Sequence, residues 1–309
     1  MKNFLFLFVI LFAFPTYAQQ DAQFTQYVYN TININPAYAG SRDALSLIAV
    51  YRDQQLGLDG TPRTFSFSAN SPLRNEKLGL GVSIIRDNIF IIDETFVDID
   101  FSYTINTSSK GKLAFGIRGG FQLFNVDFAR LNPEDGFGDD FSSANNVENN
   151  FSPNIGAGIY YYTDKFYIGY STPTLLQTRF FDGEGSNNSS FLARDRVTHN
   201  IIAGYVFDIT DDIKLKPATL LRAVSGAPIG LDISGSLLFN EKFSAGINYR
   251  LDAAISGLVS FQISDALTIG YSYDRDTNAL RRFNDGSHEI FLRFEFKSNK
   301  GGIISPRFF

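Results

Sequence analysis

The sequence contains no cysteine and no tryptophan, only one methionine and only two histidines. Without cysteine the chain has no disulfide framework, no thiolate metal site and no cysteine for a lipid anchor, so its stability depends on packing and hydrogen bonds. Long apolar runs are also missing. The run at residues 4–14 is too short for a membrane-spanning helix, which needs about 20 apolar residues, and this excludes a helical membrane protein.

The first 18 residues have the features of a secretory signal peptide. Lys2 gives the start a positive charge, the apolar run follows, and Thr16-Tyr17-Ala18 offers small residues at the cleavage positions. We therefore expect residues 1–18 to be removed on export and the mature chain to begin at Gln19.

The residues that are abundant favour strands. Phe (32), Tyr (15) and Gly (26) are frequent, and aromatic residues are enriched in strands. Mean hydropathy is −0.06 with 44% apolar residues, as expected for strands with one lipid-facing side. Loss of Lys2 from the 27 basic residues leaves 26 against 32 acidic ones, a net charge of −6, which argues against a nucleic-acid partner.

From residue 44 onward the sequence alternates between apolar and polar residues. In residues 96–103, Val97, Ile99 and Phe101 alternate with Asp98 and Asp100, and residues 113–123 and 289–296 repeat the pattern. Such alternation predicts strands with one apolar and one polar face. If the apolar face contacts lipid, the lumen receives charges of both signs that can pair across the interior: Asp98, Asp100, Arg118, Arg222, Arg250, Arg293 and Glu295.

The number of strands and the lengths of their connections predict a membrane barrel. Tight turns at 163–165, 240–241 and 264–265 all follow even-numbered strands, and long polar connections near 125–153, 173–196 and 275–286 all follow odd-numbered ones. Short periplasmic turns and long external loops have this phase in an outer-membrane barrel, whereas a soluble sandwich has no reason to keep it. The fold class is therefore all-β, a transmembrane antiparallel β-barrel of about 14 strands, near residues 43–52, 63–70, 77–86, 94–105, 112–124, 154–163, 165–172, 197–208, 213–224, 229–239, 242–251, 254–263, 266–274 and 287–298.

A short unit recurs after the predicted periplasmic turns. It reads LGLGV (78–82), LAFGI (113–117), FYIGY (166–170), FSAGI (243–247) and LTIGY (267–271). Such recurrence indicates one hairpin used repeatedly. The glycine at the fourth position falls on the lumen face, where it permits close approach of another segment or bending of the strand.

Candidate chemistry is sparse, and we expect neither catalysis nor a cofactor. An outer-membrane hydrolase would need its histidines, His199 and His288, and Ser287, His288 and Asp285 resemble a triad in composition. Neighbouring strand residues point to opposite faces, so Ser287 and His288 are not expected to meet. A weaker candidate is an external calcium site in the acidic loop 132–141, with oxygen ligands from Glu134, Asp135, Asp139 and Asp140.

The two ends of the mature chain fall outside the strand pattern. Residues 19–42 are rich in Gln, Asn and Tyr and lack alternation, so their backbone cannot face lipid unpaired. We expect this segment to enter the lumen as a plug or to pack below the barrel. The predicted organisation is a signal peptide (1–18), this N-terminal segment (19–42), the barrel (43–298) and a periplasmic tail (299–309), whose two Phe residues either dock a partner or tuck under the rim.

The segment QFTQYVYNTININPAYAGS (23–41) and the ending SPRFF (305–309) resemble the two ends of the PorP/SprF family of type IX secretion system outer-membrane proteins. The internal SPL (71–73) and STPTLL (171–176) are similar to that family as well. The resemblance covers essentially the whole mature chain. The family residues that it carries over, without an assigned role for any, are Gln26, Tyr27, Asn30, Asn35, Pro36, Tyr38, Gly40, Pro306, Arg307 and Phe308.

The resemblance implies an outer-membrane barrel that assists export or surface anchoring of a secreted protein, such as an adhesin used in gliding motility. The implied partners are a large secreted protein with a type IX signal and other type IX components in the periplasm or outer membrane. The alternative is an outer-membrane solute channel or hydrophobic-compound transporter, because a plugged 14-stranded barrel suits that function equally well and fold does not fix function.

Overall fold

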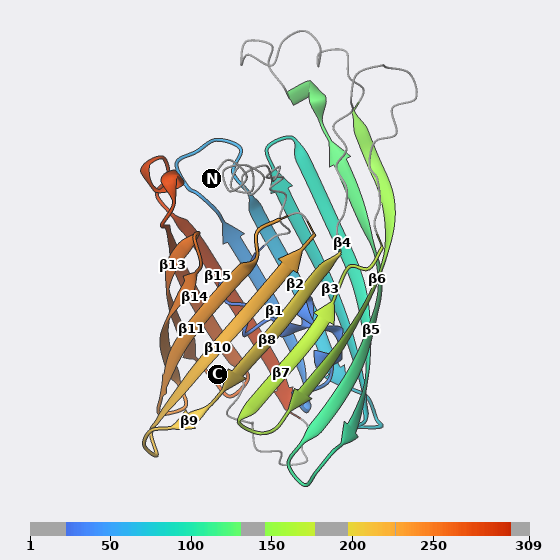
Figure 1. The fold of residues 1–309 in the computed structure, drawn as a ribbon, viewed down its shortest axis with the longest axis vertical. Coiled ribbons are helices and arrows are strands. Elements are labelled where there is room, and N and C mark those ends of the chain that lie inside the picture. The colour runs from blue at the N-terminus through green and yellow to red at the C-terminus, as the bar shows by residue number, and fades with distance from the viewer. Residues whose placement is uncertain (1–22, 131–145, 177–196, 226, 298–309) are drawn as a thin grey trace, which may run out of the picture.

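The computed structural model describes residues 23–130, 146–176, 197–225 and 227–297. One antiparallel sheet of 15 strands closes into a barrel through the pairings of β1 with β15 and of β10 with β11. The two-residue β9 continues β8 along β10, so the barrel has 14 strand positions plus this extra strand. The predicted all-β barrel is thus confirmed (Figure 1).

The strands are β1 (Ala44–Asp53), β2 (Arg63–Pro72), β3 (Leu78–Ile89), β4 (Ile92–Asn106), β5 (Lys112–Val126), β6 (Val147–Tyr162), β7 (Phe166–Thr172), β8 (Thr198–Tyr205), β9 (Phe207–Asp208), β10 (Ile213–Val224), β11 (Gly230–Phe239), β12 (Phe243–Arg250), β13 (Ala254–Gln262), β14 (Leu267–Asp276) and β15 (Ser287–Lys297). The helical turns are α2 (Thr31–Ile34), η1 (Pro36–Tyr38), η2 (Phe128–Arg130) and η4 (Ala279–Arg282). No helix in these described ranges is long and apolar enough to cross a membrane.

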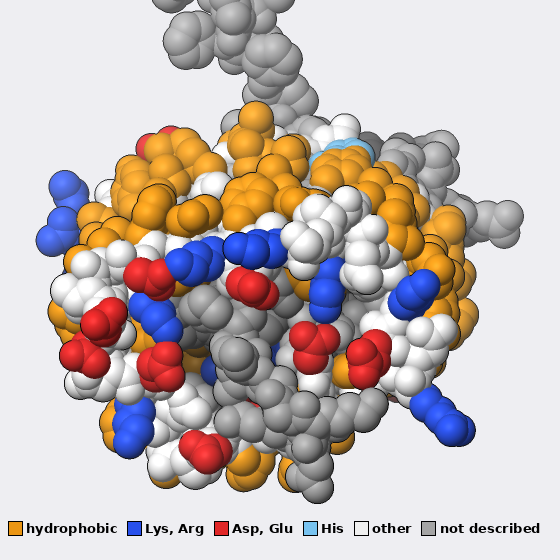
Figure 2. Space-filling model, turned by 90° about the horizontal axis from the view of Figure 1, so that it is seen from below, with side chains coloured by type: hydrophobic (Ala, Val, Ile, Leu, Met, Phe, Trp, Pro, Cys, Tyr) orange, Lys and Arg blue, Asp and Glu red, His pale blue; other side chains and the backbone are white. Residues whose placement is uncertain are grey.

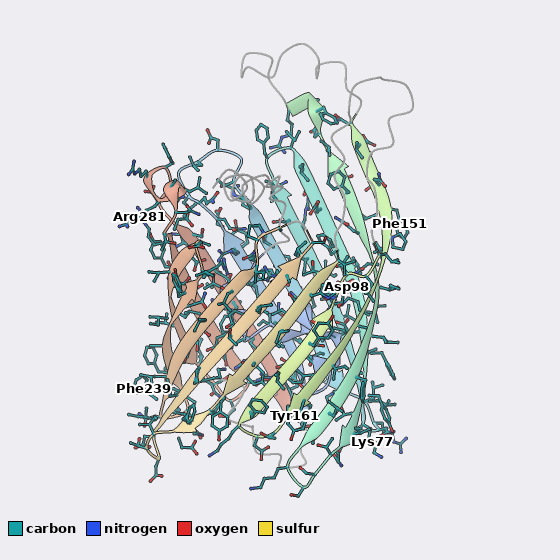
Figure 3. All side chains as sticks on the ribbon, viewed as in Figure 1. Lys77, Asp98, Phe151, Tyr161, Phe239 and Arg281 are labelled. Atoms are coloured by element: carbon teal, nitrogen blue, oxygen red, sulfur yellow. The ribbon has the colours of Figure 1, made fainter. Side chains whose placement is uncertain are left out.

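The two ends of the barrel differ as the connection lengths predict. Connections at the end that carries Lys77 are all short, at 73–77, 107–111, 163–165, 209–212, 240–242 and 263–266. The opposite end, which carries Arg281, has the long connections 54–62, 127–146, 173–197 and 277–286 (Figure 3). In the tight turn between β11 and β12, Asn240 and Glu241 both have positive φ (49° and 56°), as type I′ hairpin turns require.

The strands expose apolar side chains outward and bury polar ones inside. In β4, Asp98, Asp100 and Ser102 are buried while Ile99 and Phe101 are exposed. Ile117 is 64% and Ile247 70% exposed on the outer wall, a pattern that a soluble exterior does not sustain around a whole barrel. Viewed from the short-turn end, hydrophobic side chains cover the wall and charges of both signs lie on the end face (Figure 2). The exterior is that of an outer-membrane barrel.

Most strands lie within three residues of the predicted bounds, and β6 differs most. β6 begins at Val147 rather than near residue 154, and β5 continues to Val126, so these strands form a longer hairpin than predicted. The start of β6, Glu148-Asn149-Asn150, is polar on both faces and contains a positive φ at Asn149 (50°), which hides its strand character. The predicted strand 197–208 is interrupted at Val206.

The main hydrophobic core lies inside the barrel rather than between two sheets. Its largest cluster joins Tyr27, Ile32, Ala37 and Tyr38 to inward residues of the wall such as Tyr160. Tyr38 and Tyr160 meet edge to face with ring centroids 5.6 Å apart. The segment that precedes β1 therefore supplies much of the interior.

Candidate functional site inside the barrel

The described part of the N-terminal segment, residues 23–42, lies within the lumen. Its hydrogen-bond partners come from strands all around the barrel: Tyr27 Oη lies 3.1 Å from Ser234 Oγ of β11, and Tyr29 Oη lies 3.1 Å from Ser260 Oγ of β13. On the other side, Asn33 Nδ2 donates to Ser66 Oγ of β2 at 2.8 Å. Burial raises the pKa of the Tyr27 phenol above its ordinary value, so this group stays a neutral hydrogen-bonding partner.

Local sequence shapes the turn in the middle of the segment. Asn35 accepts the Ala37 N–H through its side chain at 2.9 Å and so caps η1. Pro36 occupies the start of η1, where a missing N–H costs nothing. Gly40 has φ 71°, and a Cβ there would stand 2.8 Å from Gly79 Cα, so only glycine fits this conformation and this approach.

Inward glycines of the wall make room for this turn. A Cβ on Gly79 would stand 2.1 Å from Ala39 O, and one on Gly116 would stand 2.1 Å from Ala37 N. Gly158 and Gly169 lie in the same way against the side chain of Asn35. Gly116 and Gly169 belong to the recurring unit, as does Gly81, which lies against Ile32. The predicted lumen position of these glycines is confirmed. They lie directly against residues of the N-terminal segment.

In the units FSAGI and LTIGY, the glycine makes room for a side chain of a neighbouring strand instead. A Cβ on Gly246 would stand 2.4 Å from Ser236 Oγ, and one on Gly270 would stand 2.0 Å from the ring of Phe291. The Phe291 ring packs in turn against Tyr29 at 4.5 Å between centroids, so Gly270 supports the N-terminal segment through Phe291.

A buried group of charges holds the start of the segment. Glu289 accepts the backbone N–H groups of Thr25 (2.9 Å) and Gln26 (2.8 Å), one with each carboxylate oxygen. Arg52 lies 3.1 Å from Glu289 and 2.6 Å from Asp274. The Thr25 hydroxyl completes the group by donating to Asp274 at 2.6 Å. One guanidinium thus serves two buried carboxylates, and the N–H groups and hydroxyl of the N-terminal segment supply their further hydrogen bonds.

A second buried group holds the segment at α2. Arg118 donates to Asp100 at 2.7 Å and lies 3.4 Å from Asp98. The same guanidinium donates to the carbonyl oxygens of Ile32 (2.7 Å) and Asn33 (3.2 Å). These carbonyls lie at the end of a four-residue helix, which leaves such groups unsatisfied. Lumen charges therefore pair as predicted, but between neighbouring strands rather than across the interior: Asp100 stands opposite Arg118 on β4 and β5, and Asp232 of β11 meets Arg250 of β12 at 2.9 Å.

The structure brings seven of the carried-over residues together in this segment. They are Gln26, Tyr27, Asn30, Asn35, Pro36, Tyr38 and Gly40, and all but Gly40 are buried. Gln26 is 2% exposed, and its side-chain amide finds no hydrogen-bond partner among the described residues. The signal peptide, the residues Pro306, Arg307 and Phe308, and the calcium candidates Glu134, Asp135, Asp139 and Asp140 lie outside the described residues.

The other candidates lie apart from this site. Ser287 points inward and accepts the Gln55 N–H at 3.0 Å, while His288 points outward, 2.5 Å from Tyr271 Oη. These two residues therefore face opposite sides of the wall, as predicted. His199 also lies on the outer wall, 2.8 Å from Tyr170 Oη. The described ranges contain no cluster of three or more metal-ligating side chains.

Sequence reasoning did not identify Arg52, Asp274 and Glu289 as partners of the N-terminal segment. Inward polar positions on β1, β14 and β15 were a usable signal, because alternation assigns each of them to the lumen. Which inward charge meets which backbone group depends on barrel closure, which brings β1 beside β15.

Comparisons with known proteins agree with this architecture. The profile of one protein family, described as type IX secretion system membrane protein PorP/SprF, matches residues 16–294. A comparison with curated proteins finds no match.

Several solved structures are similar to this one at low sequence identity. The Pseudomonas putida toluene transporter TodX has 9% identity and a TM-score of 0.50, over 87% of this chain and 94% of that one. The CymD monoaromatic hydrocarbon channel has 13% identity and a TM-score of 0.49, over 87% and 93%. The Acinetobacter baumannii outer membrane protein Omp33 has 10% identity and a TM-score of 0.47, over 82% and 98%. At these identities the likeness concerns the fold alone.

Proposed function

Because the chain belongs to the PorP/SprF family of type IX secretion system membrane proteins, we propose that it works in the outer membrane by binding other proteins. In this proposal it assists export or surface anchoring of a secreted protein, such as a gliding adhesin, and contacts other type IX components. It carries out no catalysis and needs no cofactor. The observation that carries the proposal is the family match over residues 16–294, together with the occupied lumen.

The N-terminal segment acts as a plug in this proposal. It is held by two buried charge groups and by glycines that admit its backbone. A segment held so firmly across the lumen obstructs solute flow, which favours a binding function over a channel. The external connections then offer the contact surface, as loops commonly do on a rigid scaffold.

The solute-transport alternative has less support. Its argument is that the barrel shares its fold with solute channels, and fold alone does not carry function. Transport of a solute also requires a continuous path past the N-terminal segment, whose hydrogen bonds reach β11 on one side of the lumen and β2 on the other.

The proposal is tested by comparing the surface proteins of cells with and without this chain. Mass spectrometry of proteins released from the cell surface is expected to show loss of one or a few secreted proteins when the gene is deleted. Restoring the intact gene is expected to bring them back. If every surface protein stays in place after deletion, the proposed role in export or anchoring is wrong.

A further inference from the structure

A cavity of about 120 Å³ lies between the N-terminal segment and the barrel wall. The segment contributes Phe24, Tyr27 and Ile34 to its lining, and the wall contributes residues of β3, β4, β5, β6, β8 and β10. The cavity lies toward the end with the long connections, because two of its lining residues, Thr198 at the start of β8 and Pro173 after β7, lie at that end. A molecule bound here would contact the segment and the wall at once.

Apolar side chains meet at one place in this cavity. Ile85 lies between the inward polar residues Ser83 and Asp87 of β3. The strand register places it directly opposite Phe96 of β4, and both line the cavity together with Phe24 of the segment. These three side chains form a small apolar surface within inward rows that are otherwise polar, as ligand sites commonly do.

Two asparagine amides of the wall also line the cavity, Asn154 of β6 and Asn200 of β8. Asn154 donates to the Pro173 carbonyl oxygen at 3.0 Å, which leaves its Oδ1 atom as an acceptor. The Oδ1 atoms of both residues have no hydrogen-bond partner among the described residues, and Asn200, the more buried of the two, is only 4% exposed. Because a buried acceptor without a hydrogen bond is unfavourable, the cavity favours a ligand that carries a donor.

The charges and the volume of the cavity limit this ligand further. Asp98 lines the cavity and already lies 3.4 Å from Arg118, which also pairs with Asp100. A further buried charge without a partner would be costly, so an uncharged ligand is favoured. A cavity of about 150 Å³ holds benzene, so a single ring with one small substituent is the largest body that suits this one.

We propose that this cavity binds a small uncharged molecule of the phenol class, with one apolar ring and one hydroxyl group. The ring rests on Ile85 and Phe96, and the hydroxyl donates a hydrogen bond to Asn200 Oδ1. Since the bound molecule contacts the N-terminal segment and the wall together, it stabilises the plugged barrel. The inference goes beyond the proposed function, because it concerns a small molecule rather than a protein and requires no passage through the lumen.

Fluorine NMR of para-fluorophenol with the purified barrel tests the binding. A saturable change of the fluorine signal that unlabelled phenol reverses is expected for the unaltered barrel. Detergent micelles take up phenols as well, so micelles without protein supply the baseline. A signal equal to that baseline at every protein concentration would overturn the inference.

A pair of matched substitutions tests the place. Asn200→Leu replaces the amide by an apolar group of similar size. Asn70→Leu is the control, because Asn70 is also 4% exposed with an Oδ1 atom that has no partner among the described residues, but it does not line the cavity. Affinity for para-fluorophenol is expected to fall about tenfold for Asn200→Leu, as loss of one hydrogen bond implies, and to stay unchanged for Asn70→Leu. Equal affinity of all three barrels would contradict the proposed site.

Fluorobenzene separates the hydrogen bond from general damage to the cavity. It has the ring but no hydroxyl, so the Asn200→Leu barrel is expected to bind it at least as well as the unaltered barrel does. Migration of the unheated proteins on gels checks that both variants fold. If Asn200→Leu weakens fluorobenzene and para-fluorophenol alike, the hydroxyl does not bind Asn200 and the proposal is wrong.

Proteolysis tests the consequence for the N-terminal segment. Phenol is expected to slow cleavage of the segment in the unaltered and the Asn70→Leu barrels, and to have a smaller effect at the same concentration in the Asn200→Leu barrel. Equal cleavage rates with and without phenol in the unaltered barrel would show that the bound molecule does not join the segment to the wall.

Discussion

At the scale of single residues, inward glycines decide whether the N-terminal segment fits. Gly116→Ala places a Cβ 2.1 Å from Ala37 N and 2.4 Å from Pro36 C, both backbone atoms that cannot swing away. Overpacking of this kind typically costs about 1–3 kcal/mol. We expect faster proteolysis of the segment and a lower unfolding midpoint of the purified barrel.

The same strand supplies the control for this prediction. A Cβ on Gly119 of β5 meets nothing within 4 Å, so Gly119→Ala is expected to leave both measurements unchanged. Equal effects of the two substitutions would show that loss of backbone freedom, rather than contact with the segment, is what matters.

The buried guanidinium of Arg118 gives the second prediction at this scale. Arg118→Met leaves Asp98 and Asp100 buried without their cation. It also removes the two hydrogen bonds that Arg118 donates to carbonyl oxygens of α2. Breaking a buried pair commonly costs roughly 3–5 kcal/mol. Denaturant unfolding is expected to show a loss of this order. An exposed pair offers the comparison: Arg86→Met removes the contact of Arg86 with Asp93 and is expected to cost about 0–1 kcal/mol.

At the scale of elements, alternation alone predicted most strands to within a few residues. It succeeds where one face meets lipid and the other the lumen, as in β4, because the two environments demand opposite residue types. Alternation fails at residues 147–153, because polar residues on both faces and Pro153 predict a loop there. For the N-terminal segment, the sequence left two positions open, inside the lumen or below the barrel. It could not decide between them because the contacts of the segment join residues far apart in the sequence, such as Gln26 and Glu289.

The N-terminal segment also gives a prediction as an element. Deletion of residues 23–41 removes the contacts that fill the lumen, so the shortened protein is expected to conduct ions in planar bilayers. The intact barrel is expected to conduct far less, and the Gly119→Ala barrel to behave like it. Equal conductance of the intact and shortened proteins would show that the segment does not plug the lumen.

At the scale of the whole molecule, the barrel presents two unlike ends. The short-turn end carries charges of both signs, with ion pairs such as Lys214 to Glu241 at 2.7 Å. The opposite end carries the long connections and the tall hairpin of β5 and β6. The sequence predicted this polarity from loop lengths, but it carries no pattern that identifies a partner, because complementarity depends on the other protein as well.

The central claim is that this barrel works by binding other proteins, and its most direct test is gentle detergent purification of the tagged protein from its own cells. Mass spectrometry then identifies whatever accompanies the barrel. We predict recovery of a large secreted protein or of periplasmic type IX components in a fixed ratio to the barrel. A barrel recovered alone, with saturable conductance for a solute, would contradict the claim and favour the solute channel.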